Sequence, residues 1–254
     1  MQTILITGAT DGIGLALAVR YAARGWRLVL VGKRPLTDLH NALFTSRNYC
    51  QVNLADPDCH EQLLAWLGRQ GIDRLDVVVH NAGVGSYGTL TEQTPAEIDT
   101  LLAVNLYAPI RLSHALLPWL PPHAGKMVFV SSVAAGLPAP AYAVYAAAKA
   151  ALESFARNLR WELAGGLQVQ IVRPGATRTG MHAKAGIPRS EMDWTKFPPA
   201  EQVADGVAAA IDRGRPVRTL GVGNRLLALA GRWLPGLLVK VQRRREGSLA
   251  DANR

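Results

Sequence analysis

The stretch QTILITGATDGIG, residues 2–14, decides the fold. Its first half is a short run of apolar and β-branched residues, which predicts a strand. Its second half places Gly8, Gly12 and Gly14 directly before a helical pattern. Glycine allows a sharp turn and lets backbone amides approach a phosphate, and the amides that open a helix favour negative charge. The stretch therefore predicts a strand, a phosphate-binding turn and a helix in succession.

The rest of the chain repeats this alternation of strands and helices. Further strands are predicted at 27–32, 48–53, 75–83, 126–132, 167–175 and 216–222. Helices are predicted at 12–25, 36–44, 57–71, 95–120, 141–166 and 199–214. Continuous apolar strands between amphipathic helices are typical of a parallel sheet covered on both faces. We expect an α/β, doubly wound (Rossmann) sheet of about seven strands, forming a single catalytic domain over residues 1–222.

Composition excludes several other classes of protein. The chain has 254 residues, of which 49% are hydrophobic, enough for a sizeable core. Cys50 and Cys59 are too few for a disulfide framework, and the six histidines show no metal-ligand spacing. No signal peptide or membrane-spanning run is recognisable. We expect reduced thiols, a cytoplasmic location and no bound metal.

The net charge of +9 is concentrated at the end of the chain. Residues 213–254 hold ten Arg or Lys and two acids, a net +8, which leaves +1 for the first 212 residues. Because the body is nearly neutral, nucleic-acid binding by the fold is not expected.

The tail, residues 223–254, is basic, and its part 224–245 is amphipathic. Pro235 is predicted to divide that part into two helical pieces. Its apolar positions are Leu226, Leu229, Ala230, Trp233 and Leu237, and its basic positions include Arg225, Arg232 and Arg243–Arg245. Three hypotheses stay open: packing on its own body or a second subunit, peripheral contact with an anionic membrane, and nucleic-acid contact.

The segment AYAVYAAAKA, residues 141–150, places Lys149 among small apolar residues. Tyr145 lies four residues before Lys149, and residues four apart share a helix face. Tyr142 lies seven before it and returns near the same face, so geometry alone leaves both tyrosines as partners of the lysine.

Six motifs together resemble the short-chain dehydrogenase/reductase (SDR) family, over about residues 2–222. They are TGATDGIG at 7–14, NAG at 81–83, VN at 104–105, VSS at 130–132, YAAAK at 145–149 and RPG at 173–175. All occur in the family's order. The resemblance selects Tyr145 over Tyr142, and Ser132, thirteen residues earlier, over Ser131.

The resemblance implies hydride transfer between a nicotinamide and a carbonyl or alcohol. Tyr145 would be the acid and base, with Lys149 lowering its pKa and holding the nicotinamide ribose. Ser132 would stabilise charge on the carbonyl oxygen, and Asn105 would hold a water in the proton relay. His80 stands where the family usually has Asn, and no role is assigned to it.

The resemblance also implies the residues that bind the cofactor. They are Gly8, Thr10, Gly12, Ile13, Gly14, Lys33, Arg34, Asn53, Leu54, Asn81, Ala82, Gly83, Tyr145, Lys149, Pro174, Gly175 and Thr179. Asn53 replaces the family's Asp beside adenine, and its oxygen can still accept a hydrogen bond from the adenine amino group.

The end of the second predicted strand indicates the choice of cofactor. Gly32 stands where an NAD-binding protein usually has an acid for the ribose 2′-hydroxyl. Lys33 and Arg34 follow, and two cations suit a 2′-phosphate, although a solvated surface pair is the alternative. Asp11 opposes this, because many NADP-preferring relatives have Arg or Lys there. We expect NADP(H), with NAD less favoured.

Residues 180–200 match the family's substrate lid. Apolar residues there and nearby predict a pocket for an apolar carbonyl or secondary alcohol: Met181, Ile187, Met192, Trp194, Phe197, Leu137, Pro138 and Tyr142. The helices at 95–120 and 141–166 usually form the family's dimer interface, so a homodimer or homotetramer is expected. The rival functions are a membrane-surface dehydrogenase of a lipid-like alcohol and a non-catalytic NADP(H)-binding regulator.

Overall fold

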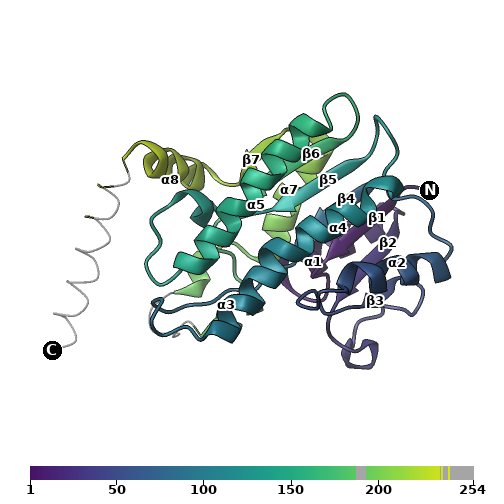
Figure 1. Cartoon of the computed structure of the whole chain (residues 1–254), viewed down its shortest axis with the longest axis horizontal. Helices are drawn as coiled ribbons and strands as arrows, with labels where there is room; N and C mark the ends of the chain where they lie inside the picture. Colours follow the sequence, from purple (N-terminus) through teal and green to yellow (C-terminus); the bar gives the residue numbers. More distant parts are fainter. Residues whose placement is uncertain (187–192, 235, 237–239, 241–254) are drawn as a thin grey trace.

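Figure 1 shows the computed structural model of the chain, which describes residues 1–186, 193–234, 236 and 240. Within these residues, one parallel sheet has the strand order β3-β2-β1-β4-β5-β6-β7. Its strands are β1 (Thr3–Thr7), β2 (Arg27–Gly32), β3 (Tyr49–Gln51), β4 (Val77–His80), β5 (Lys126–Val130), β6 (Gln168–Arg173) and β7 (Val217–Thr219). The order reverses between β1 and β4, which confirms the predicted doubly wound sheet.

Helices connect the strands, as the alternation predicts. The α-helices are α1 (Gly12–Ala23), α2 (Cys59–Arg69), α3 (Pro95–Leu102), α4 (Ala108–Leu116), α5 (Ala143–Glu162), α6 (Gly180–Lys184), α7 (Ala200–Arg213) and α8 (Val222–Trp233). Short 3-10 turns are η1 (Leu36–Asp38), η3 (Leu117–Trp119), η4 (Val133–Gly136) and η5 (Trp194–Lys196), and η2 (Ala103–Tyr107) is a π-helix.

Side chains that alternate along each strand divide the core into two layers. In β1, Ile4 and Ile6 pack with α1 and α7 on one face, while Leu5 packs with α2, α4 and α5 on the other (Figure 1). All three side chains are fully buried. Because both faces are covered, the strands are apolar without interruption, and the ends of the strands are left as the place for polar chemistry.

Two predicted helices are wrong in part. Residues 36–44 form only η1, because the Asn41 side chain accepts a hydrogen bond from the Leu43 amide and offers the backbone an alternative to the helix. The predicted helix 95–120 is divided by η2. Pro109 has no N–H to donate to the carbonyl four residues earlier, and the Ala108 amide instead reaches back five residues to Ala103.

The end of the described chain differs from the prediction in its bounds. Helix α8 begins at Val222, inside the predicted catalytic domain, and packs on η4. The predictions on Pro235, Leu237 and Arg243–Arg245 lie outside the described residues. Within the described part of the chain, no helix is long and apolar enough to cross a bilayer.

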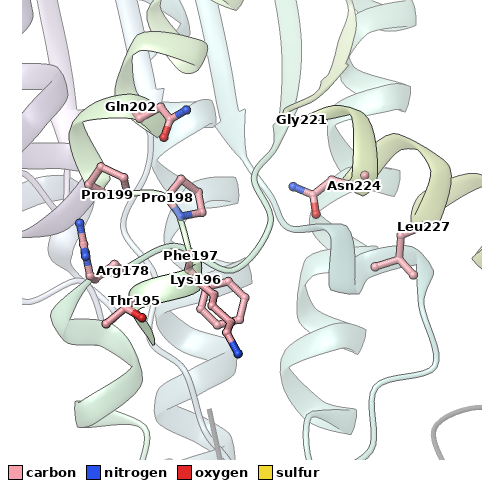
Figure 2. A pocket seen from close by; sticks show the side chains of 11 residues that line it. Arg178, Thr195, Lys196, Phe197, Pro198, Pro199, Gln202, Gly221, Asn224 and Leu227 are labelled. Carbon is pink, nitrogen blue, oxygen red and sulfur yellow. The ribbon is translucent and has the colours of Figure 1, made fainter. Parts of the chain in front are cut away.

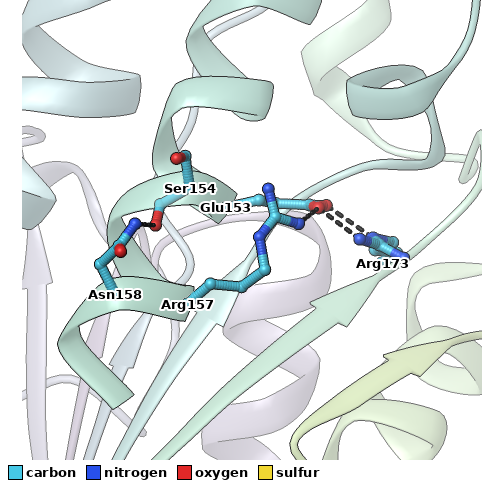
Figure 3. Close-up of polar contacts among 5 residues, drawn as sticks. All are labelled: Glu153, Ser154, Arg157, Asn158 and Arg173. Carbon is cyan, nitrogen blue, oxygen red and sulfur yellow. Dashed lines mark hydrogen bonds and ion pairs between the residues drawn. The ribbon is translucent and has the colours of Figure 1, made fainter. Parts of the chain in front are cut away.

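A buried ion pair joins α5 to the end of β6. Glu153 accepts hydrogen bonds from Arg173 Nε at 2.7 Å and from its terminal nitrogen, and Arg157 lies 3.4 Å from the same carboxylate (Figure 3). The side chain of Glu153 is only 4% exposed, so its charge needs a close partner, and the two hydrogen bonds from Arg173 supply it. The pair fixes β6 just before Pro174 and Gly175.

We predict that Glu153→Gln lowers the free energy of unfolding by about 2–3 kcal/mol, because it leaves the Arg173 charge without its buried partner. Urea denaturation measures this. Arg157→Gln is the matched control: Arg157 is 47% exposed, so its loss is expected to cost less than about 1 kcal/mol. Equal losses in the two variants would contradict a structural role for the Glu153–Arg173 pair.

Candidate active site

The carboxyl ends of β1, β4, β5 and β6 surround one cavity of about 710 Å³. Most of the predicted site residues line it: Gly8, Thr10, Gly12, Ile13, Lys33, Asn53, Leu54, Asn81, Ala82, Gly83, Ser132, Tyr145, Lys149, Pro174, Gly175 and Thr179. Three predicted residues are not among those that line it: Gly14, Arg34 and Asn105. The cavity lies where the strand order reverses, the usual ligand position in such sheets.

The glycine turn forms a cradle that leaves no room for side chains. Gly8 has φ +66°, and a Cβ there would lie 2.7 Å from the Ala82 Cα. A Cβ on Gly14 would lie 2.2 Å from the Gly8 carbonyl oxygen. Asn81 Nδ2 donates to the carbonyl of Thr7 at 3.0 Å, which joins the turn to the end of β4. The turn and the N-terminus of α1 therefore fit the pyrophosphate of a dinucleotide.

The end of β2 presents a glycine, and not an acidic side chain, to the cavity. A Cβ on Gly32 would lie 2.7 Å from Thr10 Cγ2 and 3.0 Å from the Tyr49 hydroxyl. Lys33 lines the cavity, and Arg34 donates to the Thr10 carbonyl at 2.6 Å. A carboxylate at residue 32, which would accept from a ribose 2′-hydroxyl, would require the side chains of Thr10 and Tyr49 to move.

Asp11, the acid that opposed a phosphate in the sequence, is paired with Lys184. Their side chains lie 2.8 Å apart, and Asp11 also accepts from the Gly12 amide at 2.7 Å. Partial burial acts to raise the pKa of Asp11, but the hydrogen bond and charge of Lys184 outweigh it, and the pKa lies below its usual value. Lys184 lines the cavity and was not singled out from the sequence, because 173 positions separate the two partners.

Tyr145 faces the cavity from α5 together with Ser132. Burial raises the pKa of Tyr145, and a hydrogen bond with Ser132 acts in the opposite direction. The net pKa of Tyr145 lies above its ordinary value, and the lowering by Lys149 stays a prediction. The Lys149 ammonium lies 5.9 Å from the ring centroid of Tyr145, and the desolvation of the buried phenol is the larger effect.

Lys149 is a buried cation in the same wall. Lys149 is 3% exposed, and its ammonium donates a hydrogen bond to the Val130 carbonyl at 3.1 Å. Burial lowers the pKa of Lys149 to about 8, while the charge of Glu153, one helical turn further on, acts to raise it. The charged form of such a buried lysine is stabilised by any hydroxyl or phenolate placed beside it.

Asn105 is fully buried in η2, and its side-chain amide forms hydrogen bonds with the backbone of Val84. Its Oδ1 accepts from the Val84 amide at 3.0 Å, and its Nδ2 donates to the Val84 carbonyl at 2.8 Å. The side chain therefore positions the loop that follows Asn81–Gly83. A role in holding a water stays a prediction.

The end of the cavity near Tyr145 has apolar walls. Leu137, Pro138, Tyr142 and Met181 line it, as predicted. The ring of Tyr142 lies 6.3 Å from that of Tyr145, centroid to centroid. Two other predicted lid residues, Ile187 and Met192, lie outside the described residues, and the side chain of Trp194 is not described.

Phe197 lines a second cavity instead, so its predicted place in the substrate pocket is wrong. This open cavity of about 730 Å³ lies between residues 195–199 and the start of α8, with Asn224 and Leu227 on its far side (Figure 2). Residues 198–199 lead directly into α7, whose N-cap is Pro199.

His80, which replaces the family's Asn, is part of the core. Its Nε2 lies 3.1 Å from Ser113 Oγ, and its ring stacks on Phe129 with centroids 4.8 Å apart. Because the Ser113 hydroxyl donates to the Pro109 carbonyl, Nε2 is the donor in this pair. Burial lowers the pKa of His80 to about 3, so the ring is neutral.

Comparison with known proteins identifies the family. Residues 2–189 match the family described as short chain dehydrogenase. Serine 3-dehydrogenase of Agrobacterium fabrum is 36% identical over 182 residues, which cover 70% of this chain and 72% of that protein. 11-beta-hydroxysteroid dehydrogenase A of Arachis hypogaea is 35% identical over 184 residues, covering 68% and 52%.

A solved structure, a short-chain dehydrogenase from Sphingobium yanoikuyae in complex with NADPH, superimposes with a TM-score of 0.75. It is 29% identical, and the match covers 99% of this chain and 96% of that one. The chain therefore belongs to the short-chain dehydrogenase family of oxidoreductases.

His80 generates a pH prediction. The unfolded chain binds a proton at this residue below about pH 6.5, whereas the folded protein does not until about pH 3. Stability is therefore lost as the pH falls from 6.5, by about 2 kcal/mol at about pH 5.

Urea denaturation of His80→Asn is expected to show a smaller loss of stability over this window. The exposed His114 supplies the control variant, His114→Gln, which is expected to keep the full loss. An unchanged pH dependence in His80→Asn would contradict the neutral, buried histidine.

Proposed function

We propose that the protein is an NADP(H)-dependent oxidoreductase that transfers a hydride between the nicotinamide and an apolar carbonyl or secondary alcohol. The observation that carries the proposal is that one cavity holds both parts of the site. It has the glycine turn at one end and Ser132, Tyr145 and Lys149 at the other. A non-catalytic cofactor sensor does not need these three side chains on the same wall as the cradle.

The residues present fit a dinucleotide. The crowding at Gly8 and Gly14 leaves backbone, not side chains, facing the pyrophosphate. A preference for NADP(H) is supported by Gly32 in place of an acid and by the cations of Lys33 and Arg34. The charge of Asp11 opposes it less than the sequence alone suggests, because Asp11 forms an ion pair with Lys184. The NADPH complex of the Sphingobium relative agrees with this preference.

The chain's own residues would manage the proton and the charge on the substrate oxygen. The cofactor, when bound, supplies or accepts the hydride. Ser132 would donate a hydrogen bond to the carbonyl oxygen, and Tyr145 would pass it a proton. The raised pKa of Tyr145 keeps the phenol protonated before reduction, and the ammonium of Lys149 would stabilise the phenolate that forms.

The apolar end of the cavity supports an apolar substrate. Leu137, Pro138 and Met181 offer no charge to a polar substrate. The two curated relatives are named for different substrates, serine and a hydroxysteroid, and the walls here suit the apolar one better. We expect a cytoplasmic enzyme.

The proposed homodimer would use the outer faces of α4 and α5. This is supported by exposed aromatic residues at those helices: Trp161 is 76% exposed and Tyr107 48%.

Tyr145→Phe is expected to lower kcat/KM about 100- to 10,000-fold, because the phenol that exchanges the proton is removed. Binding of NADPH is expected to stay within about threefold. NADPH oxidation with decanal or acetophenone as the carbonyl probe measures turnover.

Tyr142→Phe is the matched control for this variant, since it removes a hydroxyl from the same wall, and it is expected to keep turnover within about tenfold. If Tyr145→Phe kept full turnover, the assignment would be wrong. If neither the natural protein nor its variants turned over any carbonyl or alcohol while NADPH still bound, the non-catalytic regulator would be favoured.

The proposed preference for NADP(H) is tested separately, by comparing the affinities for NADPH and NADH. NADPH is expected to bind at least about tenfold tighter than NADH, because Lys33 lines the cavity and Arg34 follows it, and these cations would favour a 2′-phosphate. The double variant Lys33→Ala/Arg34→Ala is expected to remove that difference and leave NADH binding unchanged. Quenching of tryptophan fluorescence measures both constants. Arg47→Ala, at an exposed arginine on the β2–β3 connection, serves as the control for lost surface charge. Tighter NADH binding in the natural protein would contradict the preference.

A further inference from the structure

Helix α8 carries an exposed apolar stripe. Val222, Leu226, Leu229 and Trp233 are spaced by four, three and four residues, which places them on one helix face. They are 67%, 63%, 56% and 72% exposed. Leu234 follows directly and is 54% exposed. Single exposed apolar residues are common, but a continuous stripe of them on one helix marks an interaction surface.

The opposite face of α8 is the one that packs on the protein. Asn224, Ala228 and Gly231 lie there and are at least half-buried. A Cβ on Gly231 would lie 2.5 Å from the Gly136 carbonyl oxygen, and one on Gly175 would lie 2.3 Å from Asn224 Nδ2. These close contacts fix the rotation of the helix. The stripe is therefore held outward by packing and does not result from loose attachment.

A group of arginines adjoins the stripe. Arg225 lies on α8 beside it, Arg218 lies on β7, Arg213 ends α7, and Arg215 lies on the connection between α7 and β7. Arg225 Nε donates to the carbonyl of Thr219, the residue after Arg218, at 3.3 Å, and repulsion from Arg225, with smaller effects of burial, Arg215 and Arg213, lowers the pKa of Arg218. Within the described residues, none of the four forms an ion pair with an acid, and the neighbouring Asp212 pairs with Arg24.

The apolar stripe and the cations together select the partner. Two copies of this chain that met through α8 would bring eight arginines together without acids between them, so self-association through the stripe is opposed by charge. A neutral apolar partner would leave the arginines unused. An anionic lipid surface satisfies both, since it buries the leucines among acyl chains and pairs the arginines with headgroups.

We infer that α8 docks on an anionic membrane surface, with Val222, Leu226, Leu229 and Trp233 entering the interface and Arg218 and Arg225 facing the headgroups. The inference goes beyond the proposed reaction and does not depend on it.

The position of α8 connects this surface to the candidate active site. Its packed face lies on η4 and contacts Leu137, which lines the cavity on the other side. A protein held at the bilayer through α8 would therefore have the apolar end of its cavity one helix away from the lipid. This geometry suits a substrate that is dissolved in the membrane.

Vesicle co-sedimentation of the full chain tests the inference. The probes are vesicles of phosphatidylcholine with about one third phosphatidylglycerol, and vesicles of phosphatidylcholine alone. The protein is expected to sediment with the anionic vesicles and not with the neutral ones. Leu226→Gln/Leu229→Gln is expected to lower the partition coefficient at least about tenfold. Arg218→Gln/Arg225→Gln is expected to lower it by about the same factor.

Val19→Gln is the matched control, because Val19 is a half-exposed apolar residue on α1 and its loss is expected to leave partitioning unchanged. Thermal unfolding shows whether each variant is folded. Should a variant fail to fold, added salt applied to the natural protein gives the same test, since binding to anionic vesicles is expected to fall as salt screens the arginines.

Four results would overturn the inference, and the first three concern vesicle binding alone. They are an absence of sedimentation with anionic vesicles, equal binding by the natural protein and both double variants, and salt-independent binding. A fourth is a change of mass in sedimentation velocity for Leu226→Gln/Leu229→Gln with no change in vesicle binding, which would assign the stripe to a second copy. Because vesicle binding is measured without turnover, its failure would leave the proposed reaction standing.

Discussion

The close contact between the end of β1 and the end of β4 is the constraint on which the site depends. Thr7 Oγ1 accepts from the amides of Asn81 and Ala82 at 3.1 and 3.0 Å, and Gly8 lies against Ala82 with no room for a side chain. The strand order reverses at this point, so the helices that follow the two strands diverge to opposite faces and leave a crevice between them. The cradle, the candidate proton donor on α5 and the segment after β6 all border that crevice.

Much of the fold is predictable from the sequence because its signals are local. A strand buried on both faces is written as an apolar run, and a covering helix as a 3.6-residue pattern, so all seven strands are predicted in order. The failures have local competitors. Asn41 accepts from the Leu43 amide and so competes with a helix at 36–44, and Pro109 breaks the hydrogen-bond ladder of 95–120. The apolar periodicity of the sequence indicates neither of these two effects.

The candidate site divides in the same way. Motifs of three to eight residues predict Gly8, Ser132, Tyr145 and Lys149, and the cavity brings them together. What the sequence could not show depends on partners far along the chain. Lys184 pairs with Asp11 from 173 positions away, and Gly32 is crowded by the side chains of Thr10 and Tyr49. Burial is equally non-local, which is why the pKa of Tyr145 is raised where its neighbour Lys149 suggested the opposite. Glu153 was the one missed residue with a local signal, since it follows Lys149 by one helical turn.

A crystal structure of the full chain determined with NADPH would test the central claim most directly. The account predicts the pyrophosphate against the Gly12 amide, the 2′-phosphate near Lys33, and the nicotinamide between Tyr145 and the apolar wall at Leu137. A dinucleotide bound in the second cavity, between residues 195–199 and α8, would contradict the account. So would a nicotinamide that lies out of reach of Tyr145, because the cradle and the proton donor would then not belong to one site.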